Sequence, residues 1–231
     1  MDDITAVVTG GSRGVGAAVC RLFAREGARV VTCARDVDAL EAVVEDTRSA
    51  EGSITARGAD VREASDVAAV MRTAAETGEK INIVVANAGI YRGDPGETPL
   101  AGESYEAFDD HLATNARGVY ATVREAVPYL ADDGRVLVPS GAVARDPDPG
   151  FGSYAVSKAA AEALVRGFAT ELDQAVGIVN PGQVTTELTG NAPGRDPGDV
   201  APMFRWAAID VPPEDLDGSV LGLRDWRMAT R

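Results

Sequence analysis

The strongest constraint on the fold of this chain is its alternation of short apolar runs with longer amphipathic stretches. In the first half, each apolar run has the length of a buried strand, and the stretch after it has the spacing of an amphipathic helix. The predicted strands are residues 4–9, 28–33, 53–58 and 81–86, and the predicted helices are residues 15–26, 36–49 and 63–77. Strands that are joined through helices pair in parallel, and a parallel sheet is covered on both faces. The pattern therefore predicts an α/β fold with one doubly wound parallel sheet and right-handed crossovers.

The second half continues the alternation with longer helices and with loops rich in glycine and proline. The predicted helices are residues 105–130, 152–173 and 202–209, the predicted strands are residues 134–140, 175–180 and 219–223, and the predicted loops are residues 91–102, 146–152 and 186–202. No internal repeat, low-complexity segment or linker divides the chain. We therefore expect one domain, residues 1–231, built on about seven strands.

The charge and the apolar runs exclude two classes of partner. A net charge of -14 at pH 7 repels phosphate and argues against a nucleic acid. No apolar run approaches the roughly 18 residues of a membrane span. Residues 4–9 are also too short for a signal sequence, and Asp2 and Asp3 precede them in place of basic residues. We expect a cytoplasmic protein that binds neither nucleic acid nor membrane.

The residue types that bind metals are scarce. Cys20 and Cys33 lack the spacing of a metal site and fall on a predicted helix and a predicted strand, so we expect reduced core residues and no metal. His111 is the only histidine, which leaves histidine-rich zinc sites and Ser-His-Asp catalysis without their parts. We expect His111 to be an ordinary helix residue.

The acidic charge generates a prediction about salt. Lys80 and Lys158 are the only lysines among 22 basic residues, and an acidic, lysine-poor surface suits a high-salt cytoplasm, where screening removes self-repulsion. On this hypothesis, the free energy of unfolding measured in urea rises from low salt to molar salt. Equal stability at both salt concentrations would contradict it.

A glycine-rich turn joins the first predicted strand to the first predicted helix. Its sequence is Thr9-Gly10-Gly11-Ser12-Arg13-Gly14-Val15-Gly16. Glycines let the backbone turn sharply and approach a phosphate, and the helix that follows offers free N–H groups and the positive end of its dipole. A tight turn without a ligand is the alternative. The place of the turn between a strand and a helix favours a dinucleotide site.

Tyr154 and Lys158 stand four residues apart in the predicted helix 152–173. That spacing places both side chains on one face, one turn apart. An ammonium favours the phenolate, so we expect the pKa of Tyr154 to fall below its usual value of about 10. A phenol tuned in this way donates or accepts a proton at a carbonyl or alcohol oxygen. The alternative is a solvated surface pair.

Further motifs occur in order along the chain. They are Asp60-Val61 after the third strand, Asn87-Ala88-Gly89 after the fourth, Asn115 in the helix 105–130, Ser140 at the end of the fifth strand, and the run Pro181-Gly182-Gln183-Val184-Thr185-Thr186 after the sixth. Together with the glycine turn and the Tyr154–Lys158 pair, this set resembles the short-chain dehydrogenase/reductase family over about residues 4–186. The resemblance implies a single-domain Rossmann fold that binds a nicotinamide dinucleotide.

The resemblance also implies which residues contact the cofactor. They are Gly10, Ser12, Arg13, Gly14, Val15, Gly16, Arg35, Asp60, Val61, Asn87, Ala88, Gly89, Tyr154, Lys158, Pro181, Gly182, Val184 and Thr186. The 2′ position of the cofactor is read at the end of the second strand, where an acidic residue would repel a 2′-phosphate. Ala34 and Arg35 stand there, and Arg13 and Ser12 lie in the glycine turn. Two guanidinium groups and a hydroxyl suit a phosphate, so we favour NADP(H), with NAD(H) as the alternative.

By the same resemblance, Asn115, Ser140, Tyr154 and Lys158 form the catalytic group. Tyr154 would exchange a proton with the substrate oxygen, Lys158 would bond the nicotinamide ribose and lower the pKa of the tyrosine, and Ser140 would orient the substrate oxygen. Asn115 would hold a backbone site in a proton relay to Lys158. The alternatives are a turn role for Ser140 and a bond from Asn115 to a neighbouring carbonyl.

The family resemblance implies an NADP(H)-dependent oxidoreductase that interconverts a carbonyl and an alcohol of a small-molecule substrate. It also implies a homo-oligomer, a dimer or a tetramer, packed through helices 105–130 and 152–173, and a short substrate lid at residues 186–210. The alternatives are enoyl reduction or epimerisation on the same scaffold, and a non-catalytic NADP(H)-binding sensor. The identity of the substrate and the direction of the reaction do not follow from the sequence.

Overall fold

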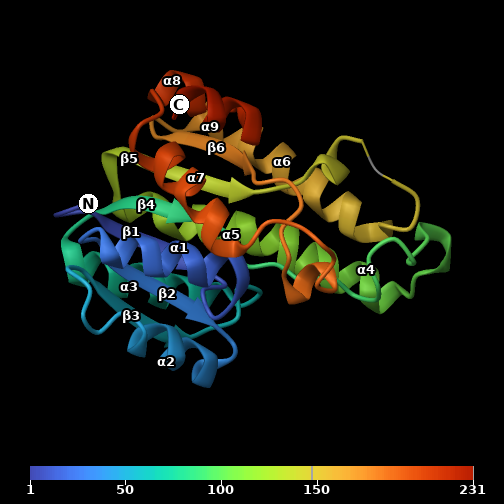
Figure 1. Ribbon diagram of the computed structural model, residues 1–231, viewed down its shortest axis with the longest axis horizontal. Coiled ribbons are helices and arrows are strands. Elements are labelled where there is room, and N and C mark those ends of the chain that lie inside the picture. Colours follow the sequence, from blue (N-terminus) through green and yellow to red (C-terminus); the bar gives the residue numbers. More distant parts are fainter. Residues whose placement is uncertain (147, 231) are drawn as a thin grey trace.

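Strands rich in β-branched residues form a parallel sheet at the centre of the protein (Figure 1). A computed structural model describes residues 1–146 and 148–230; residue 147 of the predicted loop 146–152 and residue 231 of the predicted domain lie outside the described residues. Within the described chain the strands are β1 Thr5–Thr9, β2 Arg29–Ala34, β3 Ser53–Gly58, β4 Ile81–Val85, β5 Leu130–Pro139, β6 Ala175–Asn180 and β7 Val220–Gly222. The predicted α/β fold with about seven strands in a Rossmann-like sheet is confirmed.

The sheet reverses its direction of growth beside β1. Its order is β3-β2-β1-β4-β5-β6-β7, so the chain first builds outward from β1 and then starts again on the other side with β4. Val7 of β1 pairs with Val31 of β2 on one side and with Val84 of β4 on the other, both in parallel register. At such a reversal, the loops that leave the two neighbouring strands diverge and open a crevice at the carboxyl ends.

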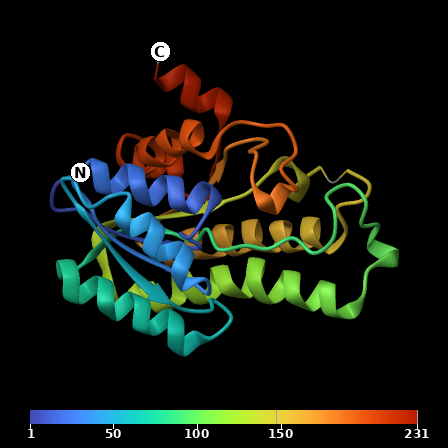
Figure 2. The same ribbon diagram turned by 60° about the horizontal axis from the view of Figure 1, so that its bottom comes forward.

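Helices cover both faces of the sheet, because successive strand residues point to opposite faces (Figure 2). Ala6 and Val8 pack with Phe23 of α1, whereas Val7 packs with Val70 of α3. One face carries α1 Gly14–Arg25, α2 Val37–Glu45 and α7 Pro197–Ile209, and the other carries α3 Ala64–Gly78, α5 Gly118–Ala126 and α6 Gly152–Glu171. The shorter helices are α4 Tyr105–His111, α8 Pro213–Leu216 and α9 Leu223–Ala229.

The predicted single helix 105–130 is interrupted in the structure. After α4, the turn η2 Leu112–Arg117 is π-helical, and α5 then continues to Ala126. The segment ends in the 3₁₀ turn η3 Val127–Tyr129, whose Pro128 has no N–H to continue an α-helix. As a result β5 begins at Leu130, earlier than the predicted start at residue 134, with a register shift against β4 between Ile81 and Ile83.

Helix α7 begins at Pro197, earlier than the predicted start at residue 202. Asp196 is the N-cap, and its Oδ1 accepts a hydrogen bond from the N–H of Gly198 at 2.7 Å. Met203 and Phe204 are fully buried in the core on the side of α1. This part of the predicted lid 186–210 is therefore core, and a lid role for the segment stays a prediction.

Candidate functional site

The parallel sheet brings most of the predicted site residues to one edge. The glycine turn follows β1, Asn87 follows β4, Ser140 follows β5, and residues 181–186 follow β6. Since all neighbouring strands pair in parallel, these segments leave the sheet at the same end, around the reversal between β1 and β4.

The glycine turn leaves β1 through two backbone conformations that favour glycine. Gly10 has a φ of +70° and Gly14 a φ of +55°. A Cβ on Gly10 would lie 2.8 Å from the Cα of Ala88, so the turn packs directly on the backbone after β4. Arg13 is the N-cap of α1 and makes no side-chain cap bond, which leaves first-turn N–H groups of the helix for another acceptor. The turn thus offers an anion a helix N-terminus.

Asn87 and Thr9 hold this turn in place. The Asn87 Nδ2 donates to the carbonyl oxygens of Thr9 at 2.9 Å and of Gly10 at 3.1 Å. In return, the N–H groups of Asn87 and Ala88 donate to the Thr9 Oγ1, each at 3.1 Å. Gly89 comes next, and a Cβ there would lie 3.3 Å from the Oδ1 of Asn115. The run from Asn87 to Gly89 therefore supports the turn and approaches the centre of the site.

Helix α6 places Tyr154 and Lys158 beside the end of β5. The Lys158 Nζ donates to the carbonyl oxygen of Pro139 at 3.0 Å and lies 5.9 Å from the centre of the Tyr154 ring. Ser140 follows Pro139, and its N–H donates to the carbonyl oxygen of Val179 at 3.0 Å. The Ser140 Oγ is buried and has no hydrogen-bond partner among the described residues. A buried hydroxyl, a phenol and an ammonium thus gather where β5 ends.

The pKa of Tyr154 is raised above its ordinary value, so the expectation of a lowered pKa is wrong for this structure. Burial of the phenol is the main cause, and the neighbouring Tyr91 adds to it. Burial also lowers the pKa of Lys158 to about 8, although Glu162 opposes that change. The Lys158 Nζ donates its hydrogen bond to the Pro139 carbonyl, and burial decides the direction in which the pKa of Tyr154 changes.

Asn115 lies in the π-helical turn η2 and ties two segments together. Its Oδ1 accepts from the N–H of Ile90 at 2.8 Å, and its Nδ2 donates to the carbonyl oxygen of Ile90 at 3.0 Å and to the Ser157 Oγ at 3.0 Å. Ser157 in turn donates to the carbonyl oxygen of Tyr154 at 2.7 Å. π-Helical turns are rare and frequently occur at functional sites. Asn115 thereby fixes α6 relative to the loop after β4.

The two arginines of the predicted phosphate clamp lie in different surroundings. Arg35 is exposed at the end of β2 and makes no ion pair with a described residue. Arg13 forms an exposed ion pair with Glu187 of η5 Glu187–Thr189. The structure thus places both guanidinium groups on the carboxyl side of the sheet, and Arg13 already has a carboxylate partner.

Asp60 and Val61 follow β3 and are held by local contacts. The Asp60 Oδ1 accepts from the N–H of Arg62 at 2.9 Å, and Oδ2 pairs with the Nε of Arg62 at 3.2 Å. Val61 is buried, and a Cβ on Gly118 of α5 would lie 2.7 Å from its Cγ2. The pair is therefore fixed at the boundary between β3 and α5.

The segment after β6 crosses towards the glycine turn. Pro181 is buried, Gly182 has a φ of +70°, and Val184 is 5% exposed. The N–H of Thr186 donates to the Thr189 Oγ1 at 3.0 Å, and a Cβ on Gly14 would lie 3.3 Å from the Thr186 Cγ2. The predicted nicotinamide segment and the predicted phosphate turn therefore meet.

The sequence reasoning missed an aromatic group around Tyr154. Its ring centre lies 4.7 Å from that of Tyr91 and 6.0 Å from that of His111, and the Phe151 ring lies 6.3 Å from Tyr91. The Tyr91 hydroxyl donates to the carbonyl oxygen of Gly150 at 3.1 Å. Two signals were available, because Tyr91 comes two residues after the Asn87-Ala88-Gly89 motif, and His111 stands four residues before Asn115.

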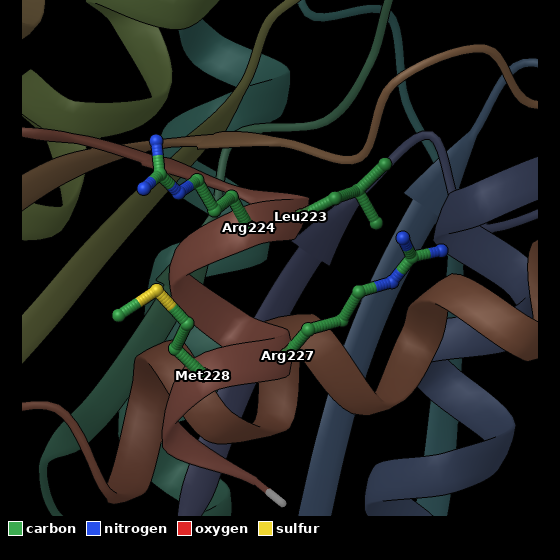
Figure 3. A pocket seen from close by; sticks show the side chains of 4 residues that line it. All are labelled: Leu223, Arg224, Arg227 and Met228. Carbon is green, nitrogen blue, oxygen red and sulfur yellow. The ribbon is translucent and has the colours of Figure 1, made fainter.

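A separate hollow lies on the C-terminal helix α9 (Figure 3). It is lined by Leu223, Arg224, Arg227 and Met228, and the close-up shows Leu223 and Arg227 on one side of the helix and Arg224 and Met228 on the other. A Cβ on Gly182 would lie 2.8 Å from the Leu223 Cδ1, so this helix abuts the segment after β6.

Neither a metal-binding cluster nor a helix able to span a membrane occurs in the described residues. No cluster of three or more His, Cys, Asp or Glu side chains in residues 1–146 and 148–230 could hold a metal ion. No helix in the same residues is long and apolar enough to cross a membrane.

A family model and two relatives match most of this chain in sequence. Residues 4–196 match the model of the short chain dehydrogenase family. Oxidoreductase UcpA of Salmonella typhimurium is 35% identical over 193 residues, which are 80% of this chain and 70% of that protein. The chloroplastic NADPH-dependent aldehyde reductase-like protein of Arabidopsis thaliana is 35% identical over 201 residues, 79% of this chain and 73% of that protein.

Solved structures with the same fold include two that hold an NADP-type ligand. An alcohol dehydrogenase from the archaeon Thermococcus sibiricus, complexed with 5-hydroxy-NADP, has a TM-score of 0.84 and 30% identity, covering 95% of both chains. A short chain dehydrogenase from Burkholderia cenocepacia in complex with NADP has a TM-score of 0.85 and 27% identity, covering 96% of both chains.

Proposed function

This chain belongs to the short-chain dehydrogenase family, and we propose that it is an NADP(H)-dependent oxidoreductase that interconverts a carbonyl and an alcohol. The observation that carries the proposal is the gathering of Ser140, Tyr154 and Lys158 at the end of β5. The Ser140 Oγ is buried without a described partner, and a buried hydroxyl that makes no hydrogen bond is costly. A substrate oxygen is the group that this hydroxyl and the Tyr154 phenol could share.

The glycine turn fits the pyrophosphate of a dinucleotide. The N-terminus of α1 has first-turn N–H groups without a side-chain cap, at the crevice where the order of the sheet reverses. Two relatives point to the phosphorylated form, since one is named as NADPH-dependent and one structural neighbour is complexed with NADP. Arg35 at the end of β2 and Arg13 in the turn are the residues that would hold its 2′-phosphate.

A bound NADP(H) supplies or accepts the hydride. The side chains of this chain would transfer the proton and orient the substrate oxygen. Tyr154 would give its phenolic proton to the substrate oxygen in reduction and take a proton in oxidation. The raised pKa of Tyr154 keeps the phenol protonated at neutral pH, which is the form that reduction needs. Ser140 would orient the same oxygen, and Lys158, cationic below a pKa of about 8, would hold the ribose and favour proton loss from the phenol. Asn115 would act as a positioning residue through Ile90 and Ser157.

The Tyr154→Phe variant tests the proton transfer. It should lower kcat for carbonyl reduction by a hundredfold or more, since general acid catalysis contributes roughly 10²–10⁴-fold. The dissociation constant for NADPH should stay within about twofold, because no phosphate contact is assigned to the phenol. The rate is followed as loss of NADPH absorbance over a panel of aldehydes and ketones. Tyr105→Phe, at a side chain that is 91% exposed, is the control. Full activity of Tyr154→Phe would refute the assignment, and NADPH binding without turnover of any carbonyl would favour a sensor.

The Arg35→Asp variant tests the assignment of the 2′-phosphate. A carboxylate at the end of β2 repels that phosphate and accepts a bond from a ribose hydroxyl, so the ratio of the NADPH to the NADH dissociation constant should rise by at least about tenfold. Both constants are measured by titration of cofactor fluorescence. Arg166→Asp makes the same change of charge at an exposed position of α6 and should leave the ratio unchanged. An unchanged ratio in Arg35→Asp would count against the clamp.

A further inference from the structure

The only histidine of the chain is buried beside Tyr154 with both ring nitrogens hydrogen-bonded. His111 ends α4 and has an exposed fraction of 0%. Its Nε2 accepts from the backbone N–H of Arg92 at 2.8 Å, and its Nδ1 lies 2.7 Å from the Ser153 Oγ. An N–H donor requires a lone pair on Nε2, so the hydrogen of the neutral ring is on Nδ1 and points at Ser153. The ring therefore has one specified tautomer.

The two hydrogen-bond partners of His111 are direct sequence neighbours of the two tyrosines of the candidate site. Arg92 follows Tyr91 in the loop after β4, and Ser153 precedes Tyr154 in the first turn of α6. His111 thus joins the loop that carries Tyr91 to the helix that carries Tyr154. The rings of Tyr91 and Tyr154 lie 4.7 Å apart, and each also meets the His111 ring edge-on.

Glu103 extends the same cluster. Its side chain is 3% exposed, its Oε2 accepts from the N–H of Ser153 at 2.7 Å, and its Oε1 has no described partner and lies 3.9 Å from the His111 Nδ1. The charged and titratable groups around His111 are therefore Glu103 before α4, Asp110 on α4, Arg92 and Tyr91 after β4, and Tyr154 on α6.

We propose that His111 is a positioning residue for Tyr154. In its neutral Nδ1–H form, the His111 ring holds the loop that carries Tyr91 against the first turn of α6. The proposal rests on the proposed function, because it assigns His111 to the proton transfer at Tyr154. The His111 ring centre lies 6.0 Å from that of Tyr154, and His111 acts only through Arg92, Ser153 and the ring contacts.

Protonation of His111 breaks this arrangement. A second hydrogen on Nε2 faces the N–H of Arg92, so that hydrogen bond is lost even though Glu103 gains a cationic neighbour. Burial is the main reason why the pKa of His111 is below its ordinary value, and Arg92 lowers it further against the opposing effects of Glu103 and Asp110. His111 is thus neutral at pH 7, and its hydrogen bond with the N–H of Arg92 is lost only at acid pH.

Nitrogen NMR of the wild-type protein labelled at its histidine tests the tautomer without any substrate. The single histidine gives one pair of ring signals. At pH 7 the signals should report a neutral ring with its hydrogen on Nδ1, and the ring should take up its second proton only below pH about 6.5, the ordinary value. A hydrogen on Nε2, or a cationic ring at pH 7, would overturn the proposal.

The kinetic test compares kcat across pH in variants of the holoenzyme. His111→Leu removes both hydrogen bonds and should lower kcat about tenfold or more, since an ångström of displacement can cost on the order of a hundredfold. The NADPH dissociation constant should stay within about twofold. In the wild-type protein, kcat should fall at acid pH as His111 is protonated, which gives its pH profile an acid limb. His111→Gln has a donor and an acceptor but does not titrate, so it should recover part of the lost kcat and abolish this acid limb.

Phe204→Leu, in the core beside α1, is the control for mere loss of stability and should leave the shape of the profile unchanged. Wild-type kcat in His111→Leu, or an acid limb that persists in His111→Gln, would overturn the proposal. If His111→Leu does not fold, the profile of His111→Gln decides. The absence of carbonyl turnover in every form, with the expected NMR tautomer, would instead speak against the proposed function.

Discussion

Parallel pairing of β1 with both β2 and β4 sets the geometry on which the rest of the site depends. Because β1 has parallel neighbours on both sides, the chain must leave it by a sharp turn and reach the next strand through a helix. Asn87 stabilises the turn through its hydrogen bonds with Thr9 and Gly10, so the motif after β4 and the motif after β1 form one unit. A change in the register between these strands would misplace the helix N-terminus and the predicted cofactor contacts together.

Burial controls the electrostatics around Tyr154 and Lys158. Desolvation raises the pKa of Tyr154 and lowers the pKa of Lys158 to about 8, so it favours the neutral form of each group. Two side chains beside Tyr154 contribute to that burial: Tyr91 of the loop after β4, whose ring lies 4.7 Å away, and His111 at the end of α4. The same loops are held by polar contacts of Asn115 and His111 with the segment at Ile90 and Arg92. The position of the Tyr154 phenol and its proton affinity therefore depend on a few buried hydrogen bonds made by residues of α4 and η2.

Most of the fold could be predicted because strand and helix periodicities are local properties. The strands β3 and β6 have the predicted bounds, while the predicted helix 105–130 missed the π-helical turn, which depends on packing against α6. The sign of the Tyr154 pKa shift was wrong, because a spacing of four residues reveals a neighbour but not the loss of water around the phenol. The contacts of Tyr91 with Tyr154 and of Ser153 with His111 could not be predicted, since each joins segments far apart in the sequence. The catalytic and cofactor roles, the cytoplasmic location, the homo-oligomer and the substrate lid stay predictions.

The most direct test of cofactor binding at the glycine turn is a fluorescence titration of the purified protein with NADPH and with NADH, at low and at high salt. We expect both cofactors to compete for one site at the glycine turn and NADPH to bind more tightly. Equal or tighter binding of NADH would contradict the assigned role of Arg13 and Arg35. No binding of either cofactor at any salt concentration would contradict the oxidoreductase itself.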